Sequence, residues 1–109
     1  MSYYLAELET LKSRGKLRIP YRNRNILLVM IEDSVYAIQD KCPHMGASLY
    51  PGKIEGEVIY CKDHNLGISI KTGKIVNEKQ AESLRLDEYS RYVKSFPITV
   101  SNGKVYLET

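Results

Sequence analysis

At 109 residues the chain has room for one domain and no second hydrophobic core, and its two cysteines indicate ligands rather than a disulfide. The longest apolar run, Ile26 to Ile31, is too short to span a bilayer, and the N-terminus lacks the features of a signal peptide, so we expect a cytoplasmic protein without membrane contact. The net charge of +3 would suit an acidic partner or nucleic acid, but no stacking aromatics interleave with the basic residues near the start, and we do not expect nucleic-acid binding.

The first part of the chain predicts a short helix followed by a polar strand. The helix is expected over residues 5–12. Basic side chains then alternate with Ser13, Gly15 and Leu17, which is typical of the solvent-facing side of a strand. These basic residues are Lys12, Arg14, Lys16 and Arg18.

The next part of the chain predicts strands joined by tight turns. The segments at 17–20 and 26–31 indicate two strands, with residues 21–25 as the polar turn between them. A second turn at 32–34 leads into a strand over 35–39.

The C-terminal part predicts a hairpin. Strands at 98–100 and 104–107 flank Ser101-Asn102-Gly103, and Asn-Gly is the strongest short hairpin signal. A second short helix is possible over residues 81–89. The predicted fold is therefore all-β and mainly antiparallel, with little helix.

Two pairs of metal-binding residues use every cysteine and every histidine in the chain. They are Cys42 and His44 and, after sixteen residues, Cys61 and His64. One zinc ion could take all four in a tetrahedral shell, or a [2Fe–2S] cluster could take the two thiolates on one iron and the two imidazoles on the other. The separation between the two pairs does not distinguish zinc from a [2Fe–2S] cluster, because zinc ribbons also place their ligand pairs roughly 15–20 residues apart. The single residue between Cys42 and His44 favours the cluster.

All four candidate ligands lie on loops within residues 41–73. The remaining parts, residues 1–40 and 74–109, then form a supporting β base from both ends of the chain. We therefore expect a single domain over residues 1–109, with an inserted cluster-binding segment.

The spacing Cys-x-His, sixteen residues, Cys-x-x-His resembles the signature of Rieske iron–sulfur proteins. Residues 42–49 are similar to the first ligand loop of that family, Gly52 falls where a glycine commonly follows, and the run from His64 to Thr72-Gly73 matches the second loop in length. The hairpin expected over 26–38 resembles the one that feeds the first loop. The resemblance implies a small Rieske-like β domain with one [2Fe–2S] cluster, bound by Cys42, His44, Cys61 and His64.

The chain departs from the family pattern at three places. Asn65 replaces a glycine beside a ligand, and since Asn tolerates positive φ better than other non-glycine residues, the turn is expected to survive. Lys62 replaces a proline, which should reduce rigidity and leave ligation intact. Residues 77–83 contain no proline, whereas the family often covers the cluster with a proline-containing segment. What covers the cluster is therefore open.

The resemblance also bears on the reduction potential. Two thiolates cancel the +2 charge of the oxidised core, so the mixed ligands raise the potential above that of a four-cysteine site, and Rieske centres span about −150 to +300 mV. High-potential members place a serine and a tyrosine two and four residues after the second histidine, where this chain has Leu66 and Ile68. Neither side chain donates a hydrogen bond, which implies the lower part of the range. Ala47 and Asp63 stand where membrane-anchored members carry an extra pair of cysteines, so the chain is similar to the ferredoxin-type branch.

The expected function is that of a one-electron carrier. The resemblance implies a flavoprotein or other reductase as donor and a terminal oxygenase or related oxidoreductase as acceptor. Pro43, Met45 and Leu66 would form an apolar rim for docking, although Met45 and Leu66 could equally pack between the loops. Three alternatives remain: the small subunit of an NAD(P)H-dependent nitrite reductase, a zinc-stabilised interaction module, and a detached regulatory domain of an oxygenase.

Overall fold

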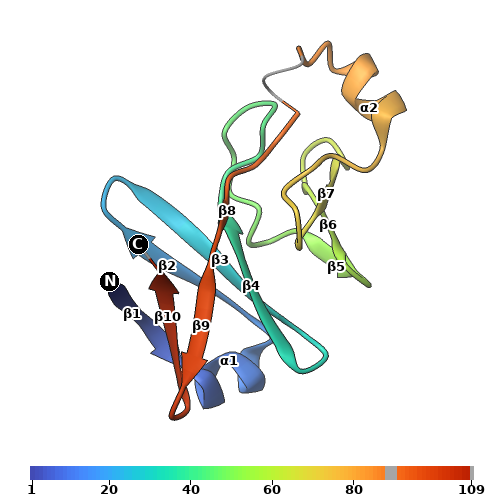
Figure 1. The fold of residues 1–109 in the computed structure, drawn as a ribbon. Coiled ribbons are helices and arrows are strands. Elements are labelled where there is room, and N and C mark those ends of the chain that lie inside the picture. Colours follow the sequence, from blue (N-terminus) through green and yellow to red (C-terminus); the bar gives the residue numbers. More distant parts are fainter. Residues whose placement is uncertain (88–90, 109) are drawn as a thin grey trace.

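The computed structural model describes residues 1–87 and 91–108, which form an elongated molecule of 44 × 26 × 18 Å (Figure 1). Short antiparallel strands dominate, as the sequence predicts. No helix in these two ranges is long and apolar enough to cross a membrane. In chain order the elements are β1 (Ser2–Glu7), α1 (Leu8–Arg14), β2 (Lys16–Tyr21), β3 (Arg24–Ile31), β4 (Ser34–Gln39), β5 (Lys53–Glu55), β6 (Val58–Tyr60), β7 (Gly67–Ser69), α2 (Glu78–Ser83), β8 (Ser95–Phe96), β9 (Ile98–Ser101) and β10 (Lys104–Glu108).

The strands form three antiparallel sheets. The orders are β2-β3-β4-β8, β1-β10-β9 and β5-β6-β7. Figure 1 shows the first two sheets with α1 at one end of the molecule, and β5, β6, β7 and α2 at the other. The strands predicted over 17–20, 26–31 and 35–39 are confirmed as parts of β2, β3 and β4, and β3 pairs with both neighbours.

The C-terminal hairpin forms as the Asn-Gly signal predicts. Ser101 pairs with Lys104, and Asn102 and Gly103 both have positive φ, 51° and 73°. Positive φ at both central residues of a two-residue hairpin loop matches the twist of the flanking strands.

The N-terminal prediction is wrong in its boundaries. The helix covers Leu8–Arg14 and not residues 5–12, because Leu5 belongs to β1, which pairs with β10. Lys12 and Arg14 therefore lie on α1, whereas the strand pattern was expected to include them. The pairing that draws Leu5 into a strand comes from the other end of the chain, where local periodicity gives no sign of it.

The second helix begins earlier than predicted. α2 spans Glu78–Ser83 rather than residues 81–89. The Leu84 N–H donates to the Gln80 carbonyl and the Arg85 N–H donates to the Glu82 carbonyl, both at 3.0 Å, and the positive φ of Arg85, 57°, ends the helix. The last two residues of the predicted helix lie outside the described residues.

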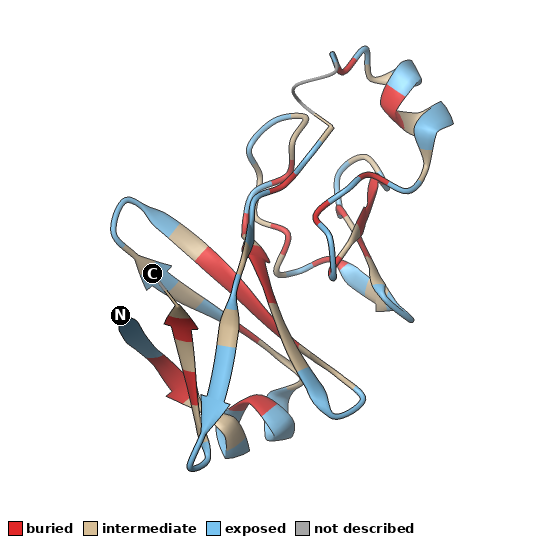
Figure 2. Ribbon diagram, viewed as in Figure 1, coloured by how far each residue is buried: buried red, intermediate tan, exposed pale blue. Residues whose placement is uncertain are grey.

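Buried side chains form two clusters. Figure 2 colours the buried residues red, and they occur both in the base and in the part that holds β6 and β7. One cluster fills the base between α1, β1, β2, β3 and β10 and includes Leu11, Ile26 and Val105, each fully buried. The other contains both cysteines and the apolar residues of β6 and β7, and it reaches back to Leu27 and Ile38 on the base sheet. The two halves of the molecule thus share β3 and β4, whose opposite faces enter different clusters.

Candidate functional site

The first candidate ligand loop, residues 42–47, is a closed turn between β4 and β5. The Cys42 N–H donates to the Ala47 carbonyl at 2.6 Å, and the Gly46 N–H donates to the Cys42 carbonyl at 2.8 Å. Gly46 has a φ of 74°, a conformation that glycine adopts without steric cost. The turn folds back on its cysteine and presents His44 at its tip.

The second loop, residues 61–66, repeats this turn between β6 and β7. The Cys61 N–H donates to the Leu66 carbonyl and the Asn65 N–H donates to the Cys61 carbonyl, both at 2.8 Å. Asn65 has a φ of 53°, so the expectation that asparagine would preserve a glycine-type turn is confirmed. Lys62, in place of the family's proline, is exposed within this turn.

The two loops bring the imidazole rings of His44 and His64 together in an edge-to-face arrangement. Their Nδ1 atoms lie 3.4 Å apart, the ring centroids are separated by 4.3 Å and the ring planes are inclined by 78°. Two nitrogen ligands on one tetrahedral metal ion, with metal–nitrogen bonds of about 2.0–2.1 Å, lie about 3.3–3.4 Å apart. Both residues are half-buried, so each ring can face solvent on the side away from its neighbour.

The two cysteines form the inner side of the site. Cys42 and Cys61 are 1% and 2% exposed, they are not joined by a disulfide, and their thiols are hydrogen-bonded to each other. Burial, reinforced by this hydrogen bond, raises the pKa of the Cys42 thiol to about 11. Backbone N–H groups of His44 and Met45 oppose the rise, because they also donate to the Cys42 sulfur.

The donors are therefore sorted into a sulfur pair and a nitrogen pair. Within residues 1–87 and 91–108 no group of three or more His, Cys, Asp and Glu side chains is close enough to hold one metal ion. A tetrahedral zinc ion needs all four donors at about 2.0–2.3 Å from one point. A two-iron cluster instead takes thiolates on one iron and imidazoles on the other, so the residues present fit a [2Fe–2S] group.

The first loop is fixed to the base by the buried carboxylate of Asp40. One oxygen accepts the backbone N–H groups of Leu49 and Tyr50, both at 2.8 Å, and the other accepts the Ser48 hydroxyl and the Arg18 Nε, both at 2.5 Å. Asp40 comes two residues before Cys42, so these contacts close the chain on both sides of the loop.

A second set of hydrogen bonds connects β2 to the segment that follows the first loop. The Lys16 ammonium donates to the Tyr50 carbonyl and, at 2.9 Å, to the Gly52 carbonyl. Lys16 and Arg18 were expected to face solvent, but Lys16 contacts the segment that follows the first loop, and Arg18 contacts Asp40, which precedes the loop. Their alternation placed them correctly on one strand face and gave no sign that another part of the chain covers it.

Gly52 and Gly73 fit the positions that the resemblance gave them. A Cβ on Gly52 would lie 2.2 Å from the Tyr60 carbonyl oxygen, so the chain passes too close there for a side chain. Gly73 has a φ of 80° and ends the turn after β7.

The second loop is held from α2, by residues that sequence reasoning did not assign to the site. The Asn77 side chain accepts the Gly67 N–H at 2.9 Å and donates to the Asn65 carbonyl at 3.0 Å. The Gln80 side chain donates to the His64 carbonyl at 2.5 Å. Residues 77–83, which lack the family's proline, therefore contact the loop directly.

The expected apolar rim is only partly present. Met45 is 72% exposed and Pro43 is half-buried, whereas Leu66 is fully buried among the residues that surround the cysteines. Leu66 thus packs between the loops and does not belong to a docking rim. Ile68 is fully buried in the same cluster.

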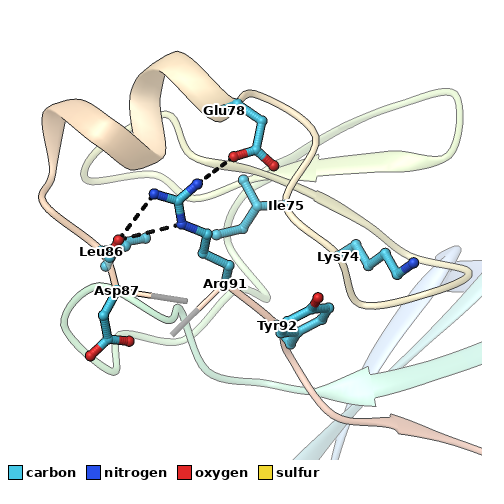
Figure 3. Close-up of a pocket in the computed structure, with 7 residues that line it drawn as sticks. All are labelled: Lys74, Ile75, Glu78, Leu86, Asp87, Arg91 and Tyr92. Carbon is cyan, nitrogen blue, oxygen red and sulfur yellow. Dashed lines mark hydrogen bonds and ion pairs between the residues drawn. The ribbon is translucent and has the colours of Figure 1, made fainter. Parts of the chain in front are cut away.

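An open cavity of about 530 Å³ lies beside α2, and none of the four Cys and His residues is among the described residues that line it. Arg91 projects into it between the Glu78 carboxylate and the Leu86 carbonyl, with Lys74 and Tyr92 at its other side (Figure 3). Arg91 is already paired, so the cavity offers no unsatisfied charge at that position.

Comparison with known proteins found a family match. The sequence profile of the Rieske [2Fe-2S] domain matches residues 1–97. The ferredoxin subunit of 3-phenylpropionate/cinnamic acid dioxygenase from Photorhabdus laumondii is 24% identical over 105 residues, covering 95% of this chain and 90% of the relative.

Two solved structures share the fold. The ferredoxin of Sphingomonas yanoikuyae B1 superposes with a TM-score of 0.82 at 18% identity, covering 100% of this chain and 99% of that one. A chain in the complex of reduced oxygenase and oxidized ferredoxin in carbazole 1,9a-dioxygenase gives a TM-score of 0.79 at 21% identity, covering 97% and 91%.

Proposed function

Because the chain belongs to the Rieske [2Fe–2S] domain family, we propose that it is a ferredoxin that carries one electron at a time between larger redox proteins. Its cofactor is the Rieske [2Fe–2S] cluster of that family. The observation that carries the proposal is the sorting of the donors, with two buried thiols on the inner side and two imidazole nitrogens 3.4 Å apart on the outer side.

We propose Cys42 and Cys61 as ligands of one iron, and His44 and His64, through Nδ1, as ligands of the other. The cluster supplies reversible one-electron chemistry when it is bound. The chain contributes the environment: the cysteines are buried away from water, whereas the half-buried histidines are partly exposed to solvent. Electrons would enter and leave through that histidine edge.

The proposed partners are a flavoprotein or other reductase as electron donor and a terminal oxygenase as acceptor, in the cytoplasm. Support comes from the relative named as a ferredoxin subunit of a dioxygenase and from the neighbour solved in a complex of oxygenase and ferredoxin. The exposed Met45 and the half-buried Pro43, beside His44, would provide the apolar contact of a transient complex.

We further propose that residues 1–109 act as one domain, with residues 41–73 as the cluster-binding segment and residues 1–40 and 74–109 as its base. In support, the loops, β5, β6 and β7 all lie in that segment, and Asp40 stands at its border with contacts to both sides.

The test is metal and sulfide analysis of the purified protein. We expect reddish-brown protein with about two irons and two acid-labile sulfides per chain, and a reduced form that donates one electron to an oxidised terminal oxygenase from the same genome. Colourless protein with one zinc per chain would overturn the proposal. His64→Cys is expected to lower the potential or to abolish the cluster, whereas a purely structural zinc site would tolerate it.

A further inference from the structure

We propose that Asn77 and Gln80 are positioning residues that hold His64 in place. The segment with α2 thereby replaces the proline-containing segment that often covers the cluster in the family and that residues 77–83 lack. The inference rests on the ligand role of His64 proposed above. It concerns side chains outside the ligand loops, in a segment where no residue is itself a candidate ligand.

The Asn77 side chain continues the hydrogen bonding between residues 67 and 76, beside the second loop. The Val76 N–H donates to the Gly67 carbonyl at 2.9 Å, and the Asn77 side chain accepts the Gly67 N–H at 2.9 Å, so both backbone groups of Gly67 are bound by neighbouring residues of one segment. The amide of the same side chain donates to the Asn65 carbonyl. One side chain thereby fixes the loop on the C-terminal side of His64.

The side chain of Asn77 is committed to this contact. Asn77 is the N-cap residue of α2, where asparagine ordinarily accepts an N–H of the first helical turn, but it makes no such hydrogen bond here. The usual stabilisation of the helix by its cap is therefore given up in favour of the ligand loop. Helix stability alone does not account for this arrangement.

Close packing brings the segment within reach. A Cβ on Gly67 would lie 2.9 Å from both the Tyr60 ring and the Val76 side chain. Such contacts are tighter than side chains tolerate, so the approach of residue 76 to the loop depends on a glycine at position 67.

Gln80 makes the contact that is nearest to the ligand itself. Its side-chain amide donates to the backbone carbonyl of His64. This hydrogen bond fixes the orientation of the His64 backbone. Because the imidazole ring projects from that backbone, the Gln80 amide limits how far the ring can move. Groups hydrogen-bonded to the ligand side chains themselves commonly change metal affinity by about 10–100-fold when they are removed, and a contact to the backbone of a ligand is expected to have a smaller effect.

α2 is itself held by neighbouring residues, so the backbone that carries the Asn77 and Gln80 side chains is fixed in position. Ala81 is fully buried in the cluster of apolar residues around the cysteines. Glu78 receives the Arg91 guanidinium at 2.6 Å, and Arg91 also donates to the Leu86 carbonyl, as Figure 3 shows. The short helix is thus tied down on both sides of Gln80.

The experiment measures how fast the loaded protein loses its cluster. Asn77→Ala and Gln80→Met, singly and together, are incubated with excess chelator, and the loss of visible absorbance is followed at a temperature well below unfolding. Each single change is expected to speed the loss about 2- to 10-fold, because one hydrogen bond contributes about 0.5–1.5 kcal/mol. Met keeps the length and helix propensity of Gln80, so the helix persists.

Ser83→Ala is the matched control, since Ser83 is an exposed residue at the end of the same helix. It is expected to leave the rate unchanged. Gln80→Lys restores a donor at position 80 and is expected to recover most of the wild-type rate. The electron paramagnetic resonance spectrum of the reduced protein gives a second readout, because a shifted His64 ring changes the line shape whereas a general loss of stability does not.

The outcomes separate the two proposals. A wild-type protein that binds no cluster overturns the proposed function and this inference with it. A wild-type protein that binds the cluster, with Asn77→Ala and Gln80→Met indistinguishable from Ser83→Ala in rate and spectrum, overturns the positioning role alone. Faster cluster loss also overturns the positioning role if the unfolding temperature falls in proportion and the spectrum is unchanged, because lower overall stability then accounts for the loss.

Discussion

Gly46 and Asn65 occupy equivalent places in the two ligand loops, each donating its backbone N–H at 2.8 Å to the carbonyl of the cysteine four residues before it. Both have positive φ, 74° and 53°. The glycine does so without cost, whereas the asparagine relies on its tolerance of this conformation.

This equivalence predicts the effect of changes at position 65. Asn65→Gly is expected to retain the cluster, and Asn65→Ala to destabilise the loop by about 1 kcal/mol, because a Cβ without a compensating polar group is disfavoured at positive φ. Cluster retention and urea unfolding measure the two effects. Asn102→Ala, at a φ of 51° in the β9–β10 hairpin, is the control: it should cost similar stability without speeding cluster loss. Equal cluster loss in both variants would contradict the assignment.

Removal of the Asp40 carboxylate should be among the most damaging single changes. Asp40→Ala leaves the Leu49 and Tyr50 N–H groups without their acceptor and is expected to cost about 3–5 kcal/mol in urea unfolding. Arg18→Ala should cost only about 1 kcal/mol, since the Arg18 side chain is 47% exposed and the carboxylate keeps its other donors. Similar losses in the two variants would argue against Asp40 as the buried centre of this network.

Two glycines with similar φ should respond differently to alanine. Gly73 and Gly15 have φ of 80° and 84°, but a Cβ on Gly73 would lie 1.9 Å from the Val93 carbonyl oxygen, whereas Gly15 faces open space. Gly15→Ala should cost about 1–2 kcal/mol, and Gly73→Ala roughly 2–5 kcal/mol from backbone strain and overpacking together. Chemical denaturation compares them, and a smaller loss for Gly73→Ala would be inconsistent with the close approach.

The reduction potential should lie in the lower part of the Rieske range, below zero within the span of about −150 to +300 mV. Leu66 and Ile68 are buried and apolar, so neither can stabilise the extra negative charge by a side-chain hydrogen bond. Spectroelectrochemical titration gives the midpoint. Leu66→Ser, which supplies a hydroxyl, should raise it, while Ser69→Ala at the half-buried end of β7 should not. A wild-type midpoint well above zero would refute the expectation.

In cluster-free protein, the Cys42 thiol should titrate near pH 11. Burial is the larger cause, so Cys61→Ala should lower this pKa by removing the thiol hydrogen bond and still leave it above 9.0. Since the folded pKa exceeds the unfolded one, the folded cluster-free protein binds more protons, and its stability should fall as the pH rises from about 9 to 11. Thiolate absorbance follows the titration. A wild-type value at or below 9 would contradict the buried assignment.

The sequence predicted the parts of the fold that depend on local chemistry. The β3–β4 pair follows from apolar segments joined by polar turns, and the β9–β10 hairpin follows from Asn-Gly. The assignment of β1 failed because Leu5 joins a strand only through its distant partner β10. Tertiary pairing overrode local periodicity there.

The candidate ligands were identifiable because their residue types are rare in this chain and their spacing is specific. The residues that hold the ligand loops in place could not be identified from the sequence. Lys16 and Asn77 looked like ordinary polar residues, since their role depends on which carbonyl or N–H the fold brings to them. For Leu66 the sequence left a docking rim and packing between the loops equally open, because its burial depends on how the two loops meet.

The pairing of β1 with β10 also constrains the order in which the molecule assembles. Ser2 and Glu108 are 106 residues apart and hydrogen-bonded, so that sheet cannot close until the last strand has left the ribosome. Contacts of such separation form slowly, whereas β5, β6 and β7 pair with near neighbours in the chain. The half that contains the four proposed ligands can therefore take shape during synthesis, before the other half is complete.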